Sequence, residues 1–483
     1  MAPYWGAALP PLGILYLAGY LEKAVPGLQT KATDGLLHGM DHTLAEIREF
    51  RPDVLCVSFY TGSALGAYAL INRAKEEFPM MEVIAGGPHA TAVPEDVLTR
   101  SAANVVVRGE GEVVLARILE RQLARGTLEP ADLAGIAGIV YRGLLGQIHQ
   151  TSTAPHVIDL DQLPYPAWHL LPLSDYHGYH LCKQSPEYPI LFSRGCPFDC
   201  VFCPNEHWNL STPRVRFRSA RNIADEMEIL HKDYGIREFH NLADELNNHP
   251  RLALETCDEI RRRKLGVTWK TLLRPEPVTE ELARHMAESG CWLASLGIET
   301  GNAETLVGVR KHFTHAQVEE TCRLLKQYGI KVQGLFMLFN VWEQDGELRV
   351  EDAAMSKKTV EYAARLLDRR LLDHTGWSIT APYPGSELHE IACRHGLIKP
   401  ELADQWDDWT VRDLFVMQLP GVSQREQIRV YRSSFLLSGK TSIEGRGIRL
   451  SDLALSAKTG MAIARYELST MLGRRQPPTR GRQ

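Results

Sequence analysis

The first third of the chain alternates short apolar runs with stretches of helical periodicity. DVLCVSF at 53–59 and MEVIAGG at 81–87 have the composition of buried strands. Between them, AYALINRAKEEF at 67–78 repeats its apolar residues every three or four positions, as an amphipathic helix does. Buried strands that alternate with such helices are typical of a parallel α/β sheet. We therefore predict a Rossmann-like domain over residues 1–140.

The alternation stops after residue 140 and resumes at residue 188. The intervening segment 141–187 contains a stretch rich in proline, histidine and aromatic residues, which we interpret as a linker. From 188 to 395 about six strands follow one another, each separated from the next by a helix, which predicts a partial (β/α)6 barrel of the TIM type, with an open sheet as the alternative. Residues 396–483 are predicted to form a small helical extension with a disordered polar end.

Composition narrows the class of protein. The 483 residues carry a formal net charge of −5 and a pI near 6.4, so the chain lacks the basic field that nucleic acids attract. No run of about eighteen apolar residues is present, and the N-terminus lacks a signal-peptide pattern. We therefore expect a soluble cytoplasmic protein that acts on a small molecule, with neither nucleic acid nor membrane as a partner.

Three of the nine cysteines form one cluster in the sequence. Cys196, Cys200 and Cys203 directly follow the strand-like run that begins at residue 188, whereas the other six are scattered and expected to be packing residues. Thiolates are the usual ligands of iron–sulfur clusters, and three of them leave one iron of a four-iron cluster without a protein ligand. The alternatives are a redox disulfide, or a zinc site completed by a fourth ligand such as His207 or Cys182.

The C-x3-C-x2-C spacing, with Phe202 immediately before the last cysteine, resembles the radical S-adenosylmethionine (SAM) superfamily. The resemblance implies a [4Fe-4S] cluster on Cys196, Cys200 and Cys203, with the amino and carboxylate groups of SAM on the open iron and Phe202 against the adenine. One electron, from a donor such as a flavodoxin or ferredoxin, would then cleave SAM to methionine and a 5′-deoxyadenosyl radical. In such an enzyme the chemistry belongs to the cofactor, and the protein positions it.

The resemblance continues past the cysteines. Arg274 follows an apolar strand, and the GIETG segment that contains Gly297 and Glu299 is similar to a GIESG-like strand of the superfamily. The resemblance implies that Arg274 binds the SAM carboxylate, and that Gly297 and Glu299 lie at its ribose or amino group. The alternative is structural, with Arg274 in a surface ion pair and Glu299 as an acid at a helix N-terminus.

The N-terminal part resembles the cobalamin-binding domain of one branch of these enzymes, through PPLGILYLAGYLE, GGPHATAVPE and GEGE. Two features depart from that branch. The strand expected before Pro10 is absent, and no D-x-H-x-x-G segment offers a histidine to cobalt. His38, His42 and His89 are the nearby histidines, and we expect each to be a loop residue. We therefore expect a degenerate domain without bound cobalamin.

Two acidic loops bear on the reaction. Asp244 and Glu245 follow the predicted second barrel strand, and Glu343 and Asp345 follow the fifth. Clustered carboxylates suit a polyhydroxylated or amino-sugar substrate, and one could act as a base during loss of water; solvated acidic loops are the alternative. The pattern is similar to the radical SAM diol-dehydratases of aminoglycoside biosynthesis. We thus predict dehydration of a sugar or aminoglycoside in antibiotic biosynthesis, with a possible downstream reductase. The alternatives are a cobalamin-dependent C-methyltransferase and a non-catalytic iron–sulfur sensor.

Overall fold

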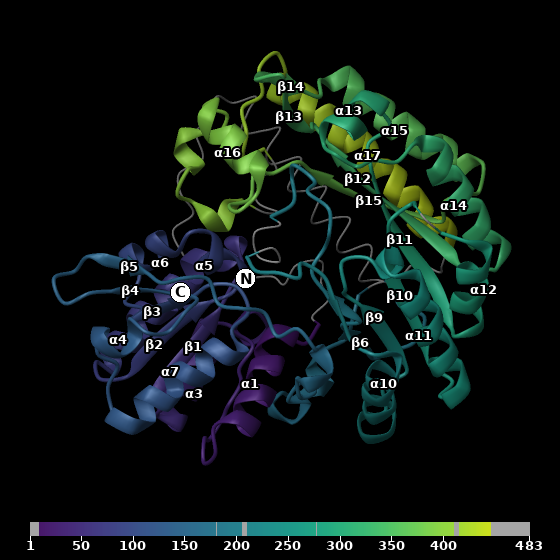
Figure 1. Cartoon of the computed structure of the whole chain (residues 1–483). Coiled ribbons are helices and arrows are strands. Elements are labelled where there is room, and N and C mark those ends of the chain that lie inside the picture. Colours follow the sequence, from purple (N-terminus) through teal and green to yellow (C-terminus); the bar gives the residue numbers. More distant parts are fainter. Residues whose placement is uncertain (1–8, 180, 205–209, 277, 410–414, 446–483) are drawn as a thin grey trace.

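Two sheets, one in each half of the chain, organise the structure, which is a computed structural model (Figure 1). It describes residues 9–179, 181–204, 210–276, 278–409 and 415–445. The N-terminal sheet and its helices form one lobe, and a strongly curled sheet with an outer layer of helices forms the other. The predicted order of a Rossmann-like domain followed by a barrel-like domain is confirmed.

The N-terminal sheet has five strands in the order β1-β2-β3-β4-β5. Strands β1 to β3 are parallel, while β4 and β5 form an antiparallel hairpin beside β3. The strands are β1 Val54–Ser58, β2 Glu82–Gly86, β3 Val105–Val107, β4 Ile139–Arg142 and β5 Ile148–Gln150. The sheet therefore runs about ten residues beyond the predicted boundary at residue 140.

Helices cover both faces of this sheet because successive strand residues point to opposite sides. Val83 and Ala85 of β2 pack into one core, and Ile84 between them packs into another. The first face is covered by α3 Met40–Phe50, α4 Ala64–Glu77 and α6 Pro94–Arg100, and the second by α1 Leu12–Ala24 and α7 Glu112–Arg125.

Strand β1 is the outer parallel strand of this sheet. Between residue 9 and β1 the structure has helices α1, α2 (Gly35–His38) and α3 and no strand. Cys56 and Ser58 of β1 are exposed, which is unusual for a strand in an α/β sheet. One edge of β1 is consequently unpaired among the described residues.

The second sheet has six parallel strands in the order β15-β12-β11-β10-β9-β6. These are β6 Glu187–Ile190, β9 Glu238–Asn241, β10 Thr268–Leu273, β11 Cys291–Glu299, β12 Lys331–Leu338 and β15 His374–Ile379. Helices lie along the outer face: α10 Ala220–Tyr234, α11 Pro250–Arg263, α12 Glu280–Glu288, α14 His315–Gln327 and α15 Ala353–Asp368. Because β6 and β15 are both edges, the barrel is partial, as predicted.

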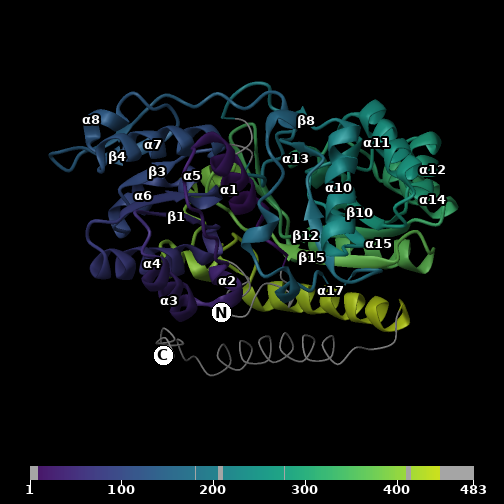
Figure 2. The same ribbon diagram turned by 90° about the horizontal axis from the view of Figure 1, so that it is seen from below.

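The C-terminal extension contacts both lobes. The side chains of Trp406 and Trp409 join the core of the N-terminal domain, and Trp406 donates a hydrogen bond to Asp96 over 2.9 Å. Helix α17 (Gln424–Gly445) packs against β15 and α15 and runs along the flank of the half-barrel (Figure 2). No helix in the described part of the chain is long and apolar enough to cross a lipid bilayer.

Candidate active site

A short hairpin presents the three cysteines. Strands β7 (Ser193–Arg194) and β8 (Arg216–Phe217) pair antiparallel and bracket the loop that contains them. Gly195 turns the chain into this loop with a φ of +90°, and a Cβ there would lie 1.9 Å from the carbonyl oxygen of Arg214. Only glycine fits such a conformation and so close an approach. The sequence predicted that a strand beginning at residue 188 leads directly into the cysteine loop, and β6 (Glu187–Ile190) is that strand.

The cysteines are half-buried free thiols. Burial raises the pKa of Cys196 to about 12 and also raises the pKa values of Cys200 and Cys203. The charge of a neighbouring cysteine raises the pKa of Cys196 and of Cys203 further, so the thiols lie within electrostatic range of one another. Such thiols ionise readily only beside a strong positive charge, which bound iron supplies.

Three thiols on one short loop are the donor set that an iron–sulfur cluster uses. Among the described residues, no three His, Cys, Asp or Glu side chains are arranged as the ligands of a single metal ion. A four-iron cluster takes each thiolate on a different iron, so its ligands are spread apart. Of the zinc alternatives, Cys182 is buried before β6, and His207 lies outside the described residues.

An ion pair lies at the carboxyl ends of the neighbouring strands. Glu299 is the last residue of β11, and its Oε1 lies 3.0 Å from Nζ of Lys311, with both side chains buried. A Cβ on Gly297 would lie 2.9 Å from Oε1 of Glu299 and 3.3 Å from Nζ of Lys311. Gly297 therefore leaves the space that this pair occupies.

Arg274 directly follows β10 and is buried, contrary to the surface-pair alternative. Its guanidinium lies 3.7 Å from the centre of the Phe198 ring, within the cysteine loop, and donates a hydrogen bond to the carbonyl oxygen of Lys311. The backbone of Arg274 exchanges two 3.0 Å hydrogen bonds with the side chain of Asn247. These contacts hold Arg274 against the cysteine loop.

Lys311 was not predicted from the sequence. Its Nζ lies 5.7 Å from the centre of the Phe202 ring, so it faces the aromatic position of the cysteine motif. Burial alone would lower the pKa of Lys311, but the charges of Glu299 and Cys200 outweigh it and raise the pKa. A single lysine after a short helix has no distinctive spacing, and only the tertiary fold brings it here.

One of the two predicted acidic loops joins this site. Glu245 Oε1 lies 3.8 Å from Nη1 of Arg274, and Glu245 Oε2 is buried without a hydrogen-bond partner. Burial raises the pKa of Asp244 to about 6 and also raises the pKa of Glu245. Both carboxyl groups thus lie in a partly desolvated region beside the cysteine loop.

The other acidic loop lies apart from these residues. Glu343 belongs to a hairpin of β13 (Val341–Gln344) and β14 (Glu347–Val350), and Asp345 is exposed in its turn. Glu343 pairs with Arg394 over 2.6 Å and with His395 over 2.7 Å, and hydrogen bonds from these two residues lower its pKa. Among the described residues, Glu343 therefore pairs with Arg394 and His395 and not with Arg274 or Lys311.

Glycine and an exposed tyrosine lie at the strand ends of the N-terminal sheet. A Cβ at Gly86, the end of β2, would meet nothing nearer than the carbonyl oxygen of Val107 at 3.8 Å. Tyr60, two residues beyond β1, is 65% exposed. Ligands of open α/β sheets bind at this carboxyl edge, so this is the edge at which a cobalamin would be expected.

His89 is not available to such a ligand. It is fully buried in α5 (Pro88–Ala92), with Nε2 3.0 Å from the Tyr68 hydroxyl and Nδ1 3.1 Å from the Thr61 hydroxyl. Both ring nitrogens are therefore engaged in hydrogen bonds. His38 and His42 lie in α2 and α3 with their rings 4.8 Å apart, so all three histidines are helical, whereas loop positions were expected.

Comparison with known families assigns both halves of the chain. Residues 5–119 match the B12 binding domain, and residues 190–349 match the radical SAM superfamily. The chain is a radical SAM enzyme with a B12-binding domain. The cysteine loop and the ends of β9 to β12 fall within the radical SAM match, and the edge formed by β1 to β3 falls within the B12-binding match.

Relatives of the whole chain include several methyltransferases. An uncharacterized methyltransferase of Pyrococcus horikoshii is 29% identical and covers 89% of this chain and 88% of its own length. Cytidylyl-2-hydroxyethylphosphonate methyltransferase of Streptomyces wedmorensis is 27% identical, with 81% and 79% covered. An anaerobic magnesium-protoporphyrin IX monomethyl ester cyclase of Rubrivivax gelatinosus is 28% identical, with 79% and 66% covered.

Two solved structures share the two-domain fold. The radical SAM methyltransferase TsrM of Kitasatospora setae, with cobalamin and a [4Fe-4S] cluster bound, has a TM-score of 0.68 at 18% identity and covers 89% of this chain and 86% of its own. The cobalamin-dependent radical SAM enzyme OxsB, with aqua-cobalamin and SAM bound, has a TM-score of 0.70 at 14% identity, with 96% and 73% covered. At these identities the likeness establishes the fold alone.

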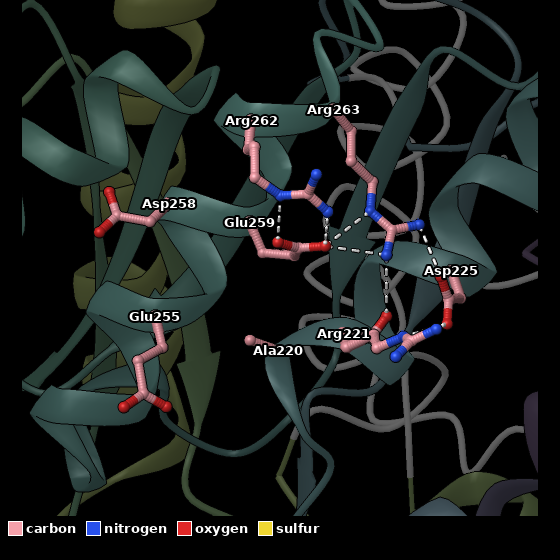
Figure 3. Close-up of a pocket in the computed structure, with 8 residues that line it drawn as sticks. All are labelled: Ala220, Arg221, Asp225, Glu255, Asp258, Glu259, Arg262 and Arg263. Atoms are coloured by element: carbon pink, nitrogen blue, oxygen red, sulfur yellow. Dashed lines mark hydrogen bonds and ion pairs between the residues drawn. The ribbon is translucent and has the colours of Figure 1, made fainter.

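A groove on the outside of the radical SAM domain lies between α10 and α11 (Figure 3). Its charged side chains pair with one another: Arg263 Nη1 lies 2.6 Å from Asp225, and Arg262 Nη2 lies 2.7 Å from Glu259. These charged side chains are thus engaged with one another, and pairs at the surface, such as that of Arg262, contribute little to stability. We therefore place the active site at the cysteine loop and not in this groove.

Proposed function

We propose that this chain is a cobalamin-dependent radical SAM methyltransferase that acts on a small molecule. One observation carries the proposal: the loop that follows β3 at the carboxyl edge of the B12-binding domain lies directly against the hairpin that carries the cysteines. Glu110 of that loop and Glu112, the first residue of α7, form ion pairs with Arg216 and Arg194 of the hairpin. A cobalamin on this edge and a SAM molecule at the cluster would therefore face one shared space, as transfer of a methyl group requires.

In this proposal, several residues of the radical SAM domain bind the cluster and SAM. Cys196, Cys200 and Cys203 would hold the cluster, Arg274 would bind the carboxylate of SAM, and Glu299 would bind its ribose or amino group. Lys311 holds the carboxylate of Glu299 in position through their 3.0 Å ion pair. When bound, the cluster supplies one electron to SAM, and cobalamin carries a methyl group. The one-electron donor, such as a flavodoxin or ferredoxin, is part of the same proposal.

Methyl transfer replaces dehydration as the favoured outcome. The acidic loops favoured dehydration in the sequence, but only Asp244 and Glu245 lie beside Arg274, while Glu343 is paired on a separate hairpin. The relatives named above include two methyltransferases that cover most of this chain. Bound cobalamin is part of the same proposal, and the match of residues 5–119 to the B12 binding domain supports it.

The test separates methyl transfer from dehydration without knowledge of the substrate. The protein is reconstituted anaerobically with iron and sulfide and incubated with SAM and a strong reductant, with and without cobalamin. We expect stoichiometric uptake of cobalamin, seen in the visible spectrum, and S-adenosylhomocysteine beside 5′-deoxyadenosine only when cobalamin is present. A dehydratase would give 5′-deoxyadenosine alone in both samples, and that result would overturn the proposal.

A further inference from the structure

Four charged side chains, two of them buried and two partly buried, form one cluster between the two domains. Arg216 donates to both carboxylate oxygens of Glu110, over 2.8 and 2.5 Å, and Arg194 pairs with Glu112 over 2.7 Å and with Glu110 over 3.6 Å. Glu110 comes from the loop between β3 and α7, Glu112 is the first residue of α7, and the two arginines come from β7 and β8. We call these four residues the interdomain ion-pair cluster.

Breaking one ion pair of this cluster costs free energy. Arg194 and Arg216 are directly opposite each other in the β7–β8 hairpin, and like charges at such positions repel. The side chain of Arg216 is 2% exposed and that of Glu112 is 5% exposed. Removing one partner of a buried ion pair leaves the other charge buried and unpaired, which is strongly destabilising. The two glutamates are therefore what allows this hairpin to carry two arginines.

The cluster also links the two cofactor edges. On the B12-binding side, the backbone N–H of Gly109 donates to the hydroxyl of Thr91, over 3.0 Å, and Thr91 belongs to the helix that follows Gly86 and Gly87. On the other side, Arg194 is two residues from Cys196, and the intervening Gly195 packs against the backbone of Arg214. A shift of Glu110 must therefore move the base of the cysteine loop.

We propose that the interdomain ion-pair cluster positions the cysteine loop, so that SAM binds productively at the iron–sulfur cluster only while the B12-binding domain holds Arg194 and Arg216 in place. These four are positioning residues, since they act through the loop that carries the cysteines. The link to cobalamin rests on the proposed function, whereas the effect on SAM cleavage does not require it.

The test compares Glu110→Gln, Arg216→Gln and the double variant with Glu77→Gln in the full chain. Glu77 is a matched control because Arg48 holds it by two hydrogen bonds of 2.7 and 2.6 Å, but on the exposed surface of the B12-binding domain. After anaerobic reconstitution, iron per chain, the melting temperature, the change that SAM causes in the electron paramagnetic resonance spectrum of the reduced cluster, and 5′-deoxyadenosine per loaded cluster are measured.

We expect both single variants to load iron but to form 5′-deoxyadenosine at least tenfold more slowly per loaded cluster, with a weaker spectral response to SAM. The double variant should be no worse than either single one, because the partners act as a unit. Glu77→Gln should match the wild type. If Glu110→Gln does not fold, Glu110→Asp keeps the charge while shortening the side chain, and should show a partial loss of the same response.

A purely structural role would give a different pattern. Variants that melt at lower temperature but keep the wild-type response to SAM and the wild-type rate per loaded cluster would overturn the inference. Cobalamin uptake, measured on the same samples, tests the proposed function separately. The wild-type protein could take up no cobalamin while the Glu110 variant still loses its response to SAM. That result would contradict the methyltransferase proposal and support the positioning role.

Discussion

The ammonium of Lys311 lies 3.0 Å from the carboxylate of Glu299, and both groups are buried at the end of β11. The same ammonium also faces the Phe202 ring of the cysteine loop. One side chain thus connects the strand that carries Glu299 with the loop that carries the cluster ligands. Neither its position in the sequence nor its neighbours indicated this role.

Lys311→Met should remove this connection and leave Glu299 as an uncompensated buried acid. We expect the cluster-free protein to lose about 3 kcal/mol of unfolding free energy, measured with denaturant, because the loss of one partner of a buried pair is costly. The reconstituted variant should form 5′-deoxyadenosine at least about tenfold more slowly, since about 1.4 kcal/mol in the transition state already gives that factor. Lys357→Met is the control, because Lys357 is exposed and lies 3.5 Å from Glu361. An unchanged stability of Lys311→Met would contradict the buried-pair assignment.

Gly297→Ala tests the space that the same pair needs. The new Cβ would approach Glu299 Oε1 to 2.9 Å and Lys311 Nζ to 3.3 Å, so the ion pair must shift. We expect normal iron content but weaker SAM binding, measured by titration against the spectrum of the reduced cluster. Gly135→Ala is the control, since nothing lies within 4 Å of a Cβ there. Equal SAM affinity in the two variants would argue against a role for this pair in binding SAM.

The sequence predicted the parts of the site that local spacing encodes. The three cysteines, Phe202 and Gly195 lie in one short loop, so their arrangement depends on few other residues. Lys311 and the pairing of Glu110 with Arg216 depend on how distant segments pack, and Glu110 and Arg216 are 106 positions apart. The second acidic loop was misleading for the same reason, because the partners of Glu343, Arg394 and His395, lie about 50 residues away.

The strand pattern predicted the two sheets better than it predicted where the N-terminal sheet ends or which distant segments pack together. Alternating strands and helices predicted the six-stranded parallel sheet and the parallel strands β1 to β3, because each strand–helix unit is recognisable from its own residues. The antiparallel hairpin of β4 and β5 was not predicted. The hairpin strand β5, Ile148–Gln150, was placed in the linker because it is short and polar and pairs only through its neighbour β4. The docking of Trp406 on Asp96 was equally hidden, because it joins segments from opposite ends of the chain.

Asp244 should make stability depend on pH. Burial raises the pKa of Asp244 in the folded protein to about 6, from 3.8. The folded state therefore favours the protonated carboxyl. The contribution of this group to stability is full below pH 3.8 and is lost as the pH rises through about 6.

Asp244→Asn should stabilise the cluster-free protein by about 1–2 kcal/mol at pH 8. This is less than the full pKa shift implies, because the side chain is partly exposed. The gain should shrink at pH 5, whereas Asp41→Asn, at an exposed carboxylate, should show no such trend in urea unfolding at the two pH values. Equal gains of Asp244→Asn at pH 5 and pH 8 would show that the carboxyl is not desolvated.

The cysteine assignment predicts which thiols iron requires. Replacement of Cys196, Cys200 or Cys203 by alanine should reduce the iron content after anaerobic reconstitution from about four atoms per chain to nearly none, because two thiolates do not retain a four-iron cluster. Cys56→Ala and Cys393→Ala are the controls, since both thiols are exposed and therefore accessible to iron, yet neither belongs to the loop. Iron and acid-labile sulfide are measured together with the visible absorbance of the cluster. A variant of the loop that keeps a full complement of iron would mean that another side chain is the third ligand, and that the open iron on which SAM chemistry depends must be sought elsewhere.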